Sequence, residues 1–547
     1  ILEEFLENNI IKKIKTIHII MLLFFLINIF FLTSFPFVHS DEAWLSGLSR
    51  HILEKQELAV TEPFFDLYPR HPHAIKIFFH TIQIIFIKLM GYHIFTFRFI
   101  SLISGTFSLY IFYLIAKNIT KSNTQAIFAV IILGIDIQFI YASHFARQEI
   151  LLLIIQLLAL NYYLKIEKKK SAKSDILLGM ILGTGIGLHP NSFLIALPFI
   201  LIYSYNVFFK KIFKISRLIT LISVLALIAL LFISISLSFN SNFINDYANY
   251  GESLGVSNSI VNKIKSFDDF YQKLFYRVSG TYYTPNIKFQ FSIFALSLFF
   301  TFIRLILCKI NKSTNCLIST KNLFTRHINR LNTLNYNSYT KILLLMFIGI
   351  NLGYVIIGRY NQTGILFIFP ISYLLVITHL SSLRRKKITY ILIIVIIAIS
   401  AYNTSSTILK ESHYNYDNYL SEIESVVDKN DKVLANINAE YYFNNGSLLD
   451  YRNLAYLKEN KLSFSEYIKS NEIEYIIYPE EMDFIYNTRP IWNILYGNLY
   501  PFYKDMKDFL HNDCTLVYSF TNKSYGMRIN KYIGKKNWSI KIYQVKN

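Results

Sequence analysis

The sequence predicts a mainly α, polytopic membrane protein with a small α/β domain at its C-terminal end. Hydrophobic residues make up 53% of the 547 residues, charged residues only 16%, and the mean hydropathy is +0.35. Apolar runs near the roughly 20-residue length that crosses a bilayer recur up to residue 404. Beyond it, strand-like and helix-like segments alternate. We therefore expect a transmembrane domain at 1–404 and an extracytoplasmic α/β domain at 405–547.

The expected membrane spans are apolar stretches separated by short clusters of Lys and Arg. The first, 17–37, is too long for the core of a signal peptide, and no small-residue cleavage site follows it, so we expect a retained anchor. A stretch at 73–91 carries His73, Lys76 and Lys88, which are costly at the bilayer centre, so we expect an interfacial helix there. About eleven spans remain, at 17–37, 97–117, 123–141, 149–165, 175–189, 191–209, 217–238, 289–308, 341–358, 362–380 and 388–403.

This count places all the basic clusters on one side of the membrane. The positive-inside rule then predicts a cytoplasmic N-terminus in a multi-pass protein of the cell membrane. The net charge of +20 is explained by these loops, so we expect membrane lipids and not nucleic acid as partners. Three cysteines without metal spacing exclude a disulfide framework. The outer segments are 38–96, 142–148, 239–288, 359–361 and everything after about residue 404.

The tail has the pattern of a small α/β domain. Helix-like stretches are expected near 417–428, 463–471 and 501–511, and the second opens with Ser463 and Glu466 in capping-box spacing. The strand-like runs between and after them are "KVLANI", "EYIIYP", "TLVYSF" and "SIKIYQV".

Two adjacent acids, Asp41 and Glu42, follow the first span in "VHSDEAWLSGLSRHIL" (38–53). A structural explanation is available, because Ser40 can cap a helix and acids in its first turn suit the helix dipole. The helix would be amphipathic and would lie on the membrane with Trp44 as its anchor. A functional explanation stays open, because the acids stand at the outer mouth of a span. The apolar stripe consists of Trp44, Leu45, Leu48, Ile52 and Leu53.

Further polar residues are expected on the same outer face. In "SHFARQEILLL" (143–153), Arg147 and Glu149 bring a second acid there, although snorkelling at a span end is the alternative. In "YPRHPHAIK" (68–76), Arg70 and His71 stand among prolines. A divalent metal could lie between His71 and Asp41, but two histidines at i and i+2 also suit an ordinary loop turn.

Two more segments bring polar groups to span ends. "GRYNQTGILFIFP" (358–370) places Arg359 and Tyr360 at the outer entrance of a span, and "GTGIGLHPNSF" (183–193) contains His189. The latter resembles a phosphate loop, but no strand precedes it. Gly183 and Gly187 in this segment follow Gly179 at intervals of four residues. This spacing is typical of closely packed membrane helices, so we reject the nucleotide-binding interpretation.

The order of these pieces resembles the polyprenyl-phosphate-dependent glycosyltransferases of the C-type membrane fold, related to glycosyltransferase family 39. This group includes the protein O-mannosyltransferases and the aminoarabinose transferases that modify lipid A. The resemblance is carried by "DEAWLSGLSRHIL", the Arg-led "FRFISLISGTFSLYIFYLIAK", "ARQEILLL" and "GRYNQTGILFIFP". It is good over about residues 17–210, patchy to 404 and absent from the tail. Two segments, "RHPH" and "LHPNS", depart from the family pattern where some members carry a Lys or an acid.

The resemblance implies transfer of a sugar from a polyprenyl-phosphate donor to a hydroxyl or amine of a lipid, glycan or protein on the outer face. It implies that Asp41 acts as general base, with inversion at the sugar, and that Glu42 and Glu149 position the acceptor or a cation. Side chains expected to bind substrate, chiefly as clamps on the donor phosphate, are Arg70, His71, Arg147, His189, Arg359 and Tyr360.

Other classes of protein share parts of this pattern. A transporter or flippase of lipid-linked sugars is expected to show broken helices with acids near mid-bilayer, and Asp136 is the only acid well inside an expected span. A polysaccharide polymerase would place its long outer loop late in the chain, whereas the amphipathic outer loop here comes first. A scaffold would leave the outer acids without a role.

Overall fold

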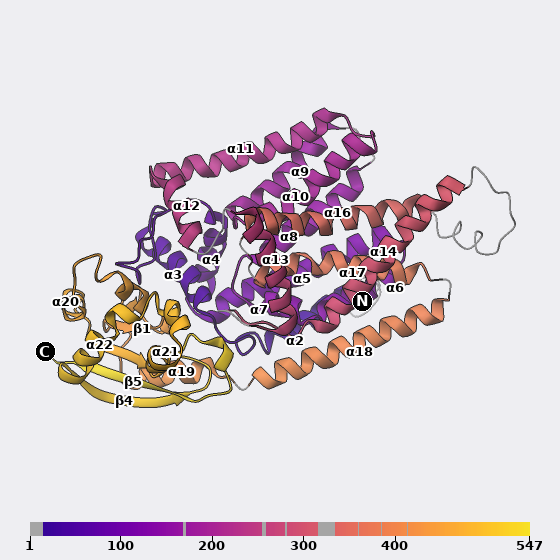
Figure 1. The fold of residues 1–547 in the computed structure, drawn as a ribbon. Coiled ribbons are helices and arrows are strands. Elements are labelled where there is room, and N and C mark those ends of the chain that lie inside the picture. The colour runs from indigo at the N-terminus through magenta and orange to yellow at the C-terminus, as the bar shows by residue number, and fades with distance from the viewer. Residues whose placement is uncertain are drawn as a thin grey trace, which may run out of the picture.

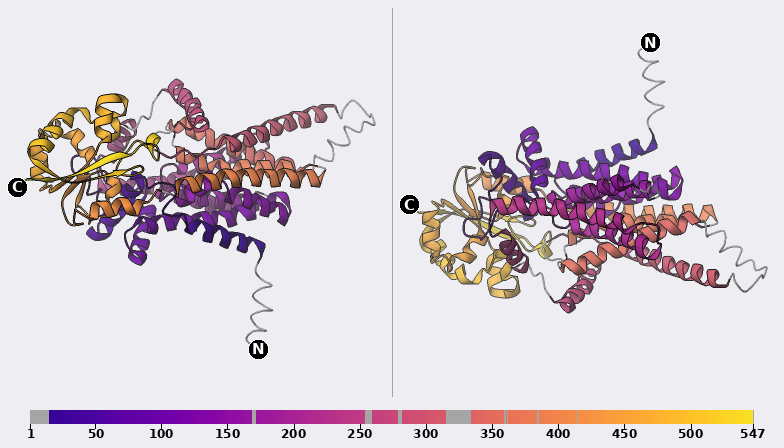
Figure 2. Two further views of the ribbon diagram at one scale, coloured as in Figure 1. Left: turned by 90° about the horizontal axis from the view of Figure 1, so that it is seen from below. Right: turned by 90° about the horizontal axis from the view of Figure 1, so that it is seen from above.

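The structure is a computed structural model, which describes residues 15–546 apart from 168–170, 254–258, 279–281, 315–333, 359, 361, 384 and 413. Long helices form an elongated bundle, and the C-terminal domain sits against one end of it (Figure 1). Views from below and from above show the same arrangement, with the sheet beyond the ends of the helices (Figure 2). The mainly helical fold with a terminal sheet domain confirms the predicted fold class.

The helices of the bundle follow one another along the chain in the order of the expected spans. Its helices are α2 (Thr16–Ile29), α3 (Ser40–Lys55), α4 (Ile77–Met90), α5 (Ile94–Thr120), α6 (Asn123–Gly134), α7 (Ile137–His144), α8 (Glu149–Ile166), α9 (Ala172–Thr184), η2 (Gly185–Gly187), α10 (Ser192–Ser204), η3 (Tyr205–Phe209), α11 (Ile215–Phe239), α12 (Phe243–Ser253), α13 (Ile260–Tyr276), α14 (Lys288–Thr314), α16 (Leu334–Ile357), η4 (Gln362–Phe367), α17 (Phe369–Ser381) and α18 (Lys386–Glu411).

Seven helices in the described part are long and apolar enough to cross a membrane, and the bent pair α6–α7 makes an eighth if it counts as one span. Shorter apolar helices at Thr16–Ile29 and Lys288–Ile303 coincide with two more expected spans, and α9 with a third. The stretch expected to be interfacial forms a helix of only 14 residues, α4. The chain is a multi-pass membrane protein, and eleven spans remain a prediction.

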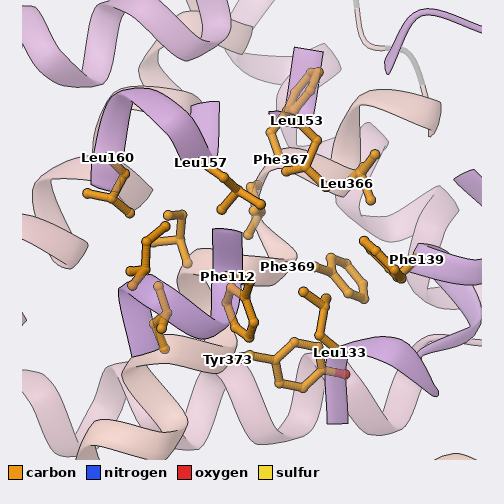
Figure 3. Close-up of a cluster of buried hydrophobic side chains, with 14 of the residues drawn as sticks. Phe112, Leu133, Phe139, Leu153, Leu157, Leu160, Leu366, Phe367, Phe369 and Tyr373 are labelled. Carbon is orange, nitrogen blue, oxygen red and sulfur yellow. The ribbon is translucent and has the colours of Figure 1, made fainter. Parts of the chain in front are cut away.

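The bundle has one continuous apolar core, to which α5, α6, α7, α8 and α17 contribute. Figure 3 shows its centre, where Phe112 of α5 and Leu157 of α8 face Phe369 and Tyr373 of α17. Each of these four side chains is almost fully buried. Helices that pack this closely provide a rigid base for the loops at their ends.

Small residues bring α9 and α11 into close contact, as their spacing predicts. A Cβ on Gly179 would lie 2.8 Å from Val224, and one on Gly183 would lie 2.3 Å from Ile228, so only glycine fits at both positions. The segment "GTGIGLHP" therefore serves helix packing.

The C-terminal domain contains a five-stranded sheet of order β2-β1-β3-β5-β4. The strands β1, β2 and β3 are parallel, while β5 is antiparallel to both β3 and β4. The elements are α19 (Tyr416–Glu424), β1 (Val433–Ala435), η5 (Ile437–Ala439), β2 (Leu448–Asp450), η6 (Tyr451–Tyr456), α20 (Phe464–Ser470), β3 (Tyr475–Pro479), α21 (Glu481–Thr488), η7 (Pro490–Tyr496), α22 (Tyr500–Asn512), β4 (Cys514–Asn522), η8 (Asn530–Tyr532) and β5 (Trp538–Val545).

Every strand and helix predicted in the tail is present, and the capping box of Ser463 and Glu466 forms. The short strand β2 was not predicted, because three residues carry no readable alternation. Helix α18 continues past the expected boundary at residue 404 and ends at Glu411.

Helix α3 departs from the prediction that it lies on the membrane surface. It packs against α4 and against the C-terminal domain, where Arg50 forms an ion pair with Glu440 and donates to the carbonyl of Phe443 at 2.8 Å. Trp44, the expected membrane anchor, packs on Phe65 inside the protein, with 4.8 Å between the rings. The amphipathic pattern was correct, but a second protein layer takes the place of lipid.

Candidate active site

The two acids lie in the first turn of α3, whose N-cap is His39 and not Ser40 as expected. The Nδ1 atom of His39 accepts a hydrogen bond from the backbone N–H of Asp41 at 3.0 Å. In return the Glu42 carboxylate accepts from the backbone N–H of His39 at 2.9 Å. The imidazole of His39 thus takes the capping role that the sequence suggested for the hydroxyl of Ser40. Its hydrogen bond to the backbone of Asp41 fixes the direction in which the Asp41 side chain points away from the helix.

Glu42 is fully buried and both of its oxygens are used. Arg98 of α5 donates to them at 2.8 and 2.9 Å, and the backbone N–H of Ala146 donates at 3.0 Å. Arg98 also donates to the carbonyls of Leu32 and Pro36. This pair therefore ties together the end of the first span, α3, α5 and the turn before α8. The geometry favours a positioning role for Glu42 over contact with an acceptor.

Arg147 lies between the other two acids. Its guanidinium donates to Asp41 and forms an ion pair with Glu149, with 3.0 Å between Nη2 and Oε1. The Tyr282 hydroxyl donates to Asp41 at 2.5 Å, and the Thr363 hydroxyl donates to Glu149 at 2.6 Å. Four segments of the chain thus meet at one cluster, and three of its members, Asp41, Arg147 and Glu149, were predicted from the sequence.

Charge dominates the ionisation of this cluster. Burial by itself would raise the pKa of Asp41, but the charge of Arg147 and the hydrogen bond from Tyr282 together lower it well below its usual range. Burial raises the pKa of Tyr282 above its usual value, so its hydroxyl stays protonated and donates. Asp41 is therefore a carboxylate at every physiological pH.

Lys76 is a cation beside this cluster that the sequence did not single out as functional. Burial together with the charges of Arg70 and Arg147 lowers its pKa to about 8. Its ammonium has no ion pair or hydrogen bond with any residue in the part of the chain that the structure describes. Its φ of +98° lies in the region that favours glycine. Such strain in a non-glycine residue is a signal of function, but it cannot be read from sequence.

Arg70, in contrast, has a carboxylate partner. Its Nη2 lies 3.1 Å from Oε1 of Glu62, and its guanidinium lies 4.9 Å from the ring of Trp44. The indole N–H of Trp44 donates to the same carboxylate. Glu62 is almost fully buried, so much of the charge of Arg70 is balanced within this group.

The other expected substrate-binding residues have different neighbours. His71 is exposed, and its Nδ1 lies 3.7 Å from a carboxylate oxygen of Asp246. The Nδ1 of His189 accepts from the backbone of Asn191 at 3.0 Å. The hydroxyl of Tyr360 donates to the carbonyl of Lys263 at 2.6 Å. Arg359 lies outside the described residues.

A divalent metal does not fit the donor set as the structure arranges it. In the described ranges, no group of three or more His, Cys, Asp and Glu side chains converges. The guanidinium of Arg147 stands between Asp41 and Glu149, where a metal would need both carboxylates. The proposed partner of Asp41, His71, faces Asp246 instead.

Residues 71–238 match the family model described as dolichyl-phosphate-mannose-protein mannosyltransferase. No curated protein matches the chain.

Among solved structures, ArnT from Cupriavidus metallidurans bound to undecaprenyl phosphate is 12% identical, with a TM-score of 0.41, over 84% of this chain and 95% of its own. The Archaeoglobus fulgidus oligosaccharyltransferase in complex with Zn and sulfate is 15% identical, with a TM-score of 0.49, over 86% of this chain and 69% of its own. AglB from the same organism, with an inhibitory peptide and a dolichol-phosphate, is 13% identical, with a TM-score of 0.46, over 94% and 75%.

The matched residues begin in the loop between α3 and α4 and end with α11. They include Arg98, Arg147 and Glu149, of which Arg98 contacts Glu42 and Arg147 contacts Asp41. The match thus covers α5 and α8, while α3, which carries Asp41 and Glu42, lies before it. Over residues 71–238 the chain is therefore similar to a family of polyprenyl-phosphate-dependent mannosyltransferases, in agreement with the resemblance that the sequence predicted.

Proposed function

We propose that the protein is an inverting transferase that moves a sugar from a polyprenyl-phosphate donor to a hydroxyl or amine of a lipid, glycan or protein. The observation that carries this proposal is the position of Arg147 between Asp41 and Glu149, where α3 and α8 begin. A cation capable of binding phosphate and a carboxylate capable of accepting a proton are thereby in contact. The description of the matching family supports a polyprenyl phosphate as the donor.

The leaving group in such a reaction is a phosphate, which needs charge stabilisation and no proton. Arg147 offers a planar fork that suits two phosphate oxygens. Lys76 adds a charge that no described residue neutralises by direct contact. Arg70, bound to Glu62, contributes through its field. We assign the donor phosphate to the space next to Arg147 and Lys76.

Asp41 is the proposed general base, but it is a weak one while Arg147 lies against it. A phosphate that attracts Arg147 would take this charge away from Asp41 and raise its pKa toward the range that proton transfer needs. The base would then become effective when the donor is bound. Glu149 would keep its contact with Arg147 and hold the guanidinium in reach of both partners.

A transporter is the competing function, and Asp136 is the observation that favours it. This buried acid stands at the break between α6 and α7, which are bent by 65°. Its oxygens accept four hydrogen bonds, from the backbone of Gln138 and Phe139 and from the side chains of Gln290 and Tyr373. An acid that is satisfied in this way caps α7 and has little capacity left to carry an ion.

The orientation in the membrane belongs to the same proposal. Helix α3 and the C-terminal domain lie at the same end of the bundle (Figure 1). We place this end outside and the N-terminus in the cytoplasm, because the basic clusters then face inward. The transfer would take place on the outer face of the cell membrane.

A direct assay tests the function. Purified protein in liposomes would be given radiolabelled mannosyl, glucosyl and aminoarabinosyl polyprenyl phosphates together with a membrane extract. We expect label from one donor to enter an acceptor with wild-type protein and not with Asp41→Asn. Movement of the donors across the liposome membrane without any transfer would overturn the proposal in favour of a transporter.

A further inference from the structure

A small cavity of about 40 Å³ lies where the C-terminal domain meets the start of α3. One wall is formed by residues 37–40, which directly precede Asp41. This volume suits a single anionic group, so the rest of a larger ligand would lie outside the cavity. A group in this cavity would be next to the first turn of α3. The C-terminal domain lines the opposite wall with polar side chains that include Asn438, Arg452, Ser524 and Arg528.

The two arginines of this wall, Arg452 and Arg528, differ in whether their N–H groups already have hydrogen-bond partners. Arg528 is fully engaged, because its three nitrogens donate to Asn436 at 2.7 Å, to the carbonyl of Leu495 at 2.8 Å and to Asp450 at 2.5 Å. It joins three segments of the C-terminal domain, so its role is structural.

Arg452 has no such partners. Within the described ranges, its guanidinium makes no hydrogen bond or ion pair and contacts only rings, with 4.7 Å to the centroid of Trp44 and 5.8 Å to that of Phe65. The side chain is half-buried. A guanidinium that lines a cavity while its N–H donors are unused can bind an anion.

The cavity also offers a hydrogen-bond acceptor on the wall that the C-terminal domain forms. The Oδ1 atom of Asn438 is buried and has no hydrogen-bond partner in the structure. Trp44, on which Arg452 lies, is one turn from Asp41 on α3. A ligand could thus place an anionic group on Arg452 and a hydroxyl toward Asn438 or Asp41.

We propose that this cavity receives an anionic group of the acceptor, so that the enzyme selects an acceptor carrying a carboxylate or phosphate beside the reacting hydroxyl. This inference rests on the proposed function. In the reaction, the acceptor oxygen forms a bond to the anomeric carbon of the donor. The bond from that carbon to the phosphate oxygen breaks, and the phosphate keeps the electron pair. The acceptor proton moves to Asp41.

Binding can be measured without turnover. Saturation-transfer NMR on the full-length protein would compare methyl glucoside, methyl glucuronide and methyl glucoside 6-phosphate. We expect one or both anionic probes to bind wild-type protein about tenfold more tightly than the neutral probe, as the loss of one charged hydrogen bond would predict. The two anionic probes distinguish a carboxylate from a phosphate.

Variants assign the effect to one side chain. Arg452→Gln should remove the preference for an anion, Arg452→Lys should keep part of it, and Arg489→Gln, exposed on the same domain, should leave it unchanged. Equal binding of all three probes by wild-type protein would overturn the inference even if Arg452→Gln failed to fold. If wild-type protein transfers sugar while Arg452→Gln keeps the preference, only this inference fails. If wild-type protein transfers nothing, the proposed function fails.

Discussion

Arg147 donates a hydrogen bond to Asp41 across 106 residues of sequence. This contact joins the proposed phosphate clamp to the proposed base, so neither can change its partner without an effect on the other. An ion pair that is broken when substrate binds would make the base respond to the donor. The contact is therefore the part of the site that mutation should test first.

Asp41→Asn should reduce turnover by about 10²- to 10⁴-fold, the usual contribution of a positioned acid or base. Asparagine can still accept from Arg147 and Tyr282, so the fold should be retained. Donor binding should be equal or tighter, because Arg147 loses a charged competitor. Single-turnover transfer and donor binding would be measured separately. Near wild-type turnover would refute the base assignment, and Glu149→Gln should cost less.

Arg147→Lys should weaken the use of the donor by about 10²-fold, because a point charge replaces a fork that contacts both Asp41 and Glu149. The readout is kcat/KM for the lipid donor. The matched control is Arg70→Lys, whose guanidinium is paired with Glu62, and a smaller loss is expected there. Donor dependence that does not change in Arg147→Lys would assign the clamp to another cation.

The ionisation of Lys76 lets us predict how kcat/KM for the lipid donor depends on pH. Its pKa of about 8 means that the charge is present below this pH and lost above it. The charged groups that act on it are Arg70, Arg147, Glu62 and Asp41. We expect kcat/KM for the donor to fall as pH rises above about 8. Lys76→Arg should extend the plateau to higher pH, and an identical profile in both proteins would contradict the role.

The docking of the C-terminal domain depends on a buried ion pair. Arg50 and Glu440 have side chains that are 8% and 0% exposed. Arg50→Met should lower the free energy of unfolding by about 3–5 kcal/mol, because it leaves a buried carboxylate without its cation. Thermal unfolding in detergent would measure this loss. The double variant Arg50→Met/Glu440→Leu should recover much of it, and equal loss in both would point to another cause.

The proposed orientation predicts which cysteines are accessible from each side. In a background of Cys308→Ser and Cys316→Ser, Lys173→Cys should react with an impermeant thiol reagent only from the cytoplasm. Lys429→Cys, exposed on the C-terminal domain, should react only from outside. Reaction of both from the same side would reverse the topology.

The fold was largely predictable because membrane helices and amphipathic strands leave strong patterns. The runs that became α5, α8 and α17 were each located from hydropathy alone. The positions of Asp41, Arg147 and Glu149 were predicted as well, since acids and arginines at the outer ends of spans are unusual.

Other features were hidden from the sequence, because they depend on contacts between distant segments. Tyr282 and Arg452 lie in stretches with no motif, and Lys76 lies in a segment singled out only for its Arg and His residues; packing brings all three close to the start of α3. The amphipathic pattern of α3 shows that one face is covered, but it cannot distinguish lipid from protein as the cover. Glu42 was predicted to position the acceptor or a cation, because the sequence does not reveal that Arg98 donates to both of its oxygens.

The contact between α3 and the C-terminal domain has a consequence for biosynthesis. Helix α3 leaves the ribosome early, whereas Glu440 and Arg452 are made after every span. Contacts of such large sequence separation form late in folding. A nascent chain would therefore carry the acids of α3 without their final cover until the C-terminal domain had been made and had folded. If the protein has the proposed function, an unfinished chain is expected to be inactive, because α3 has not yet been fixed against Glu440.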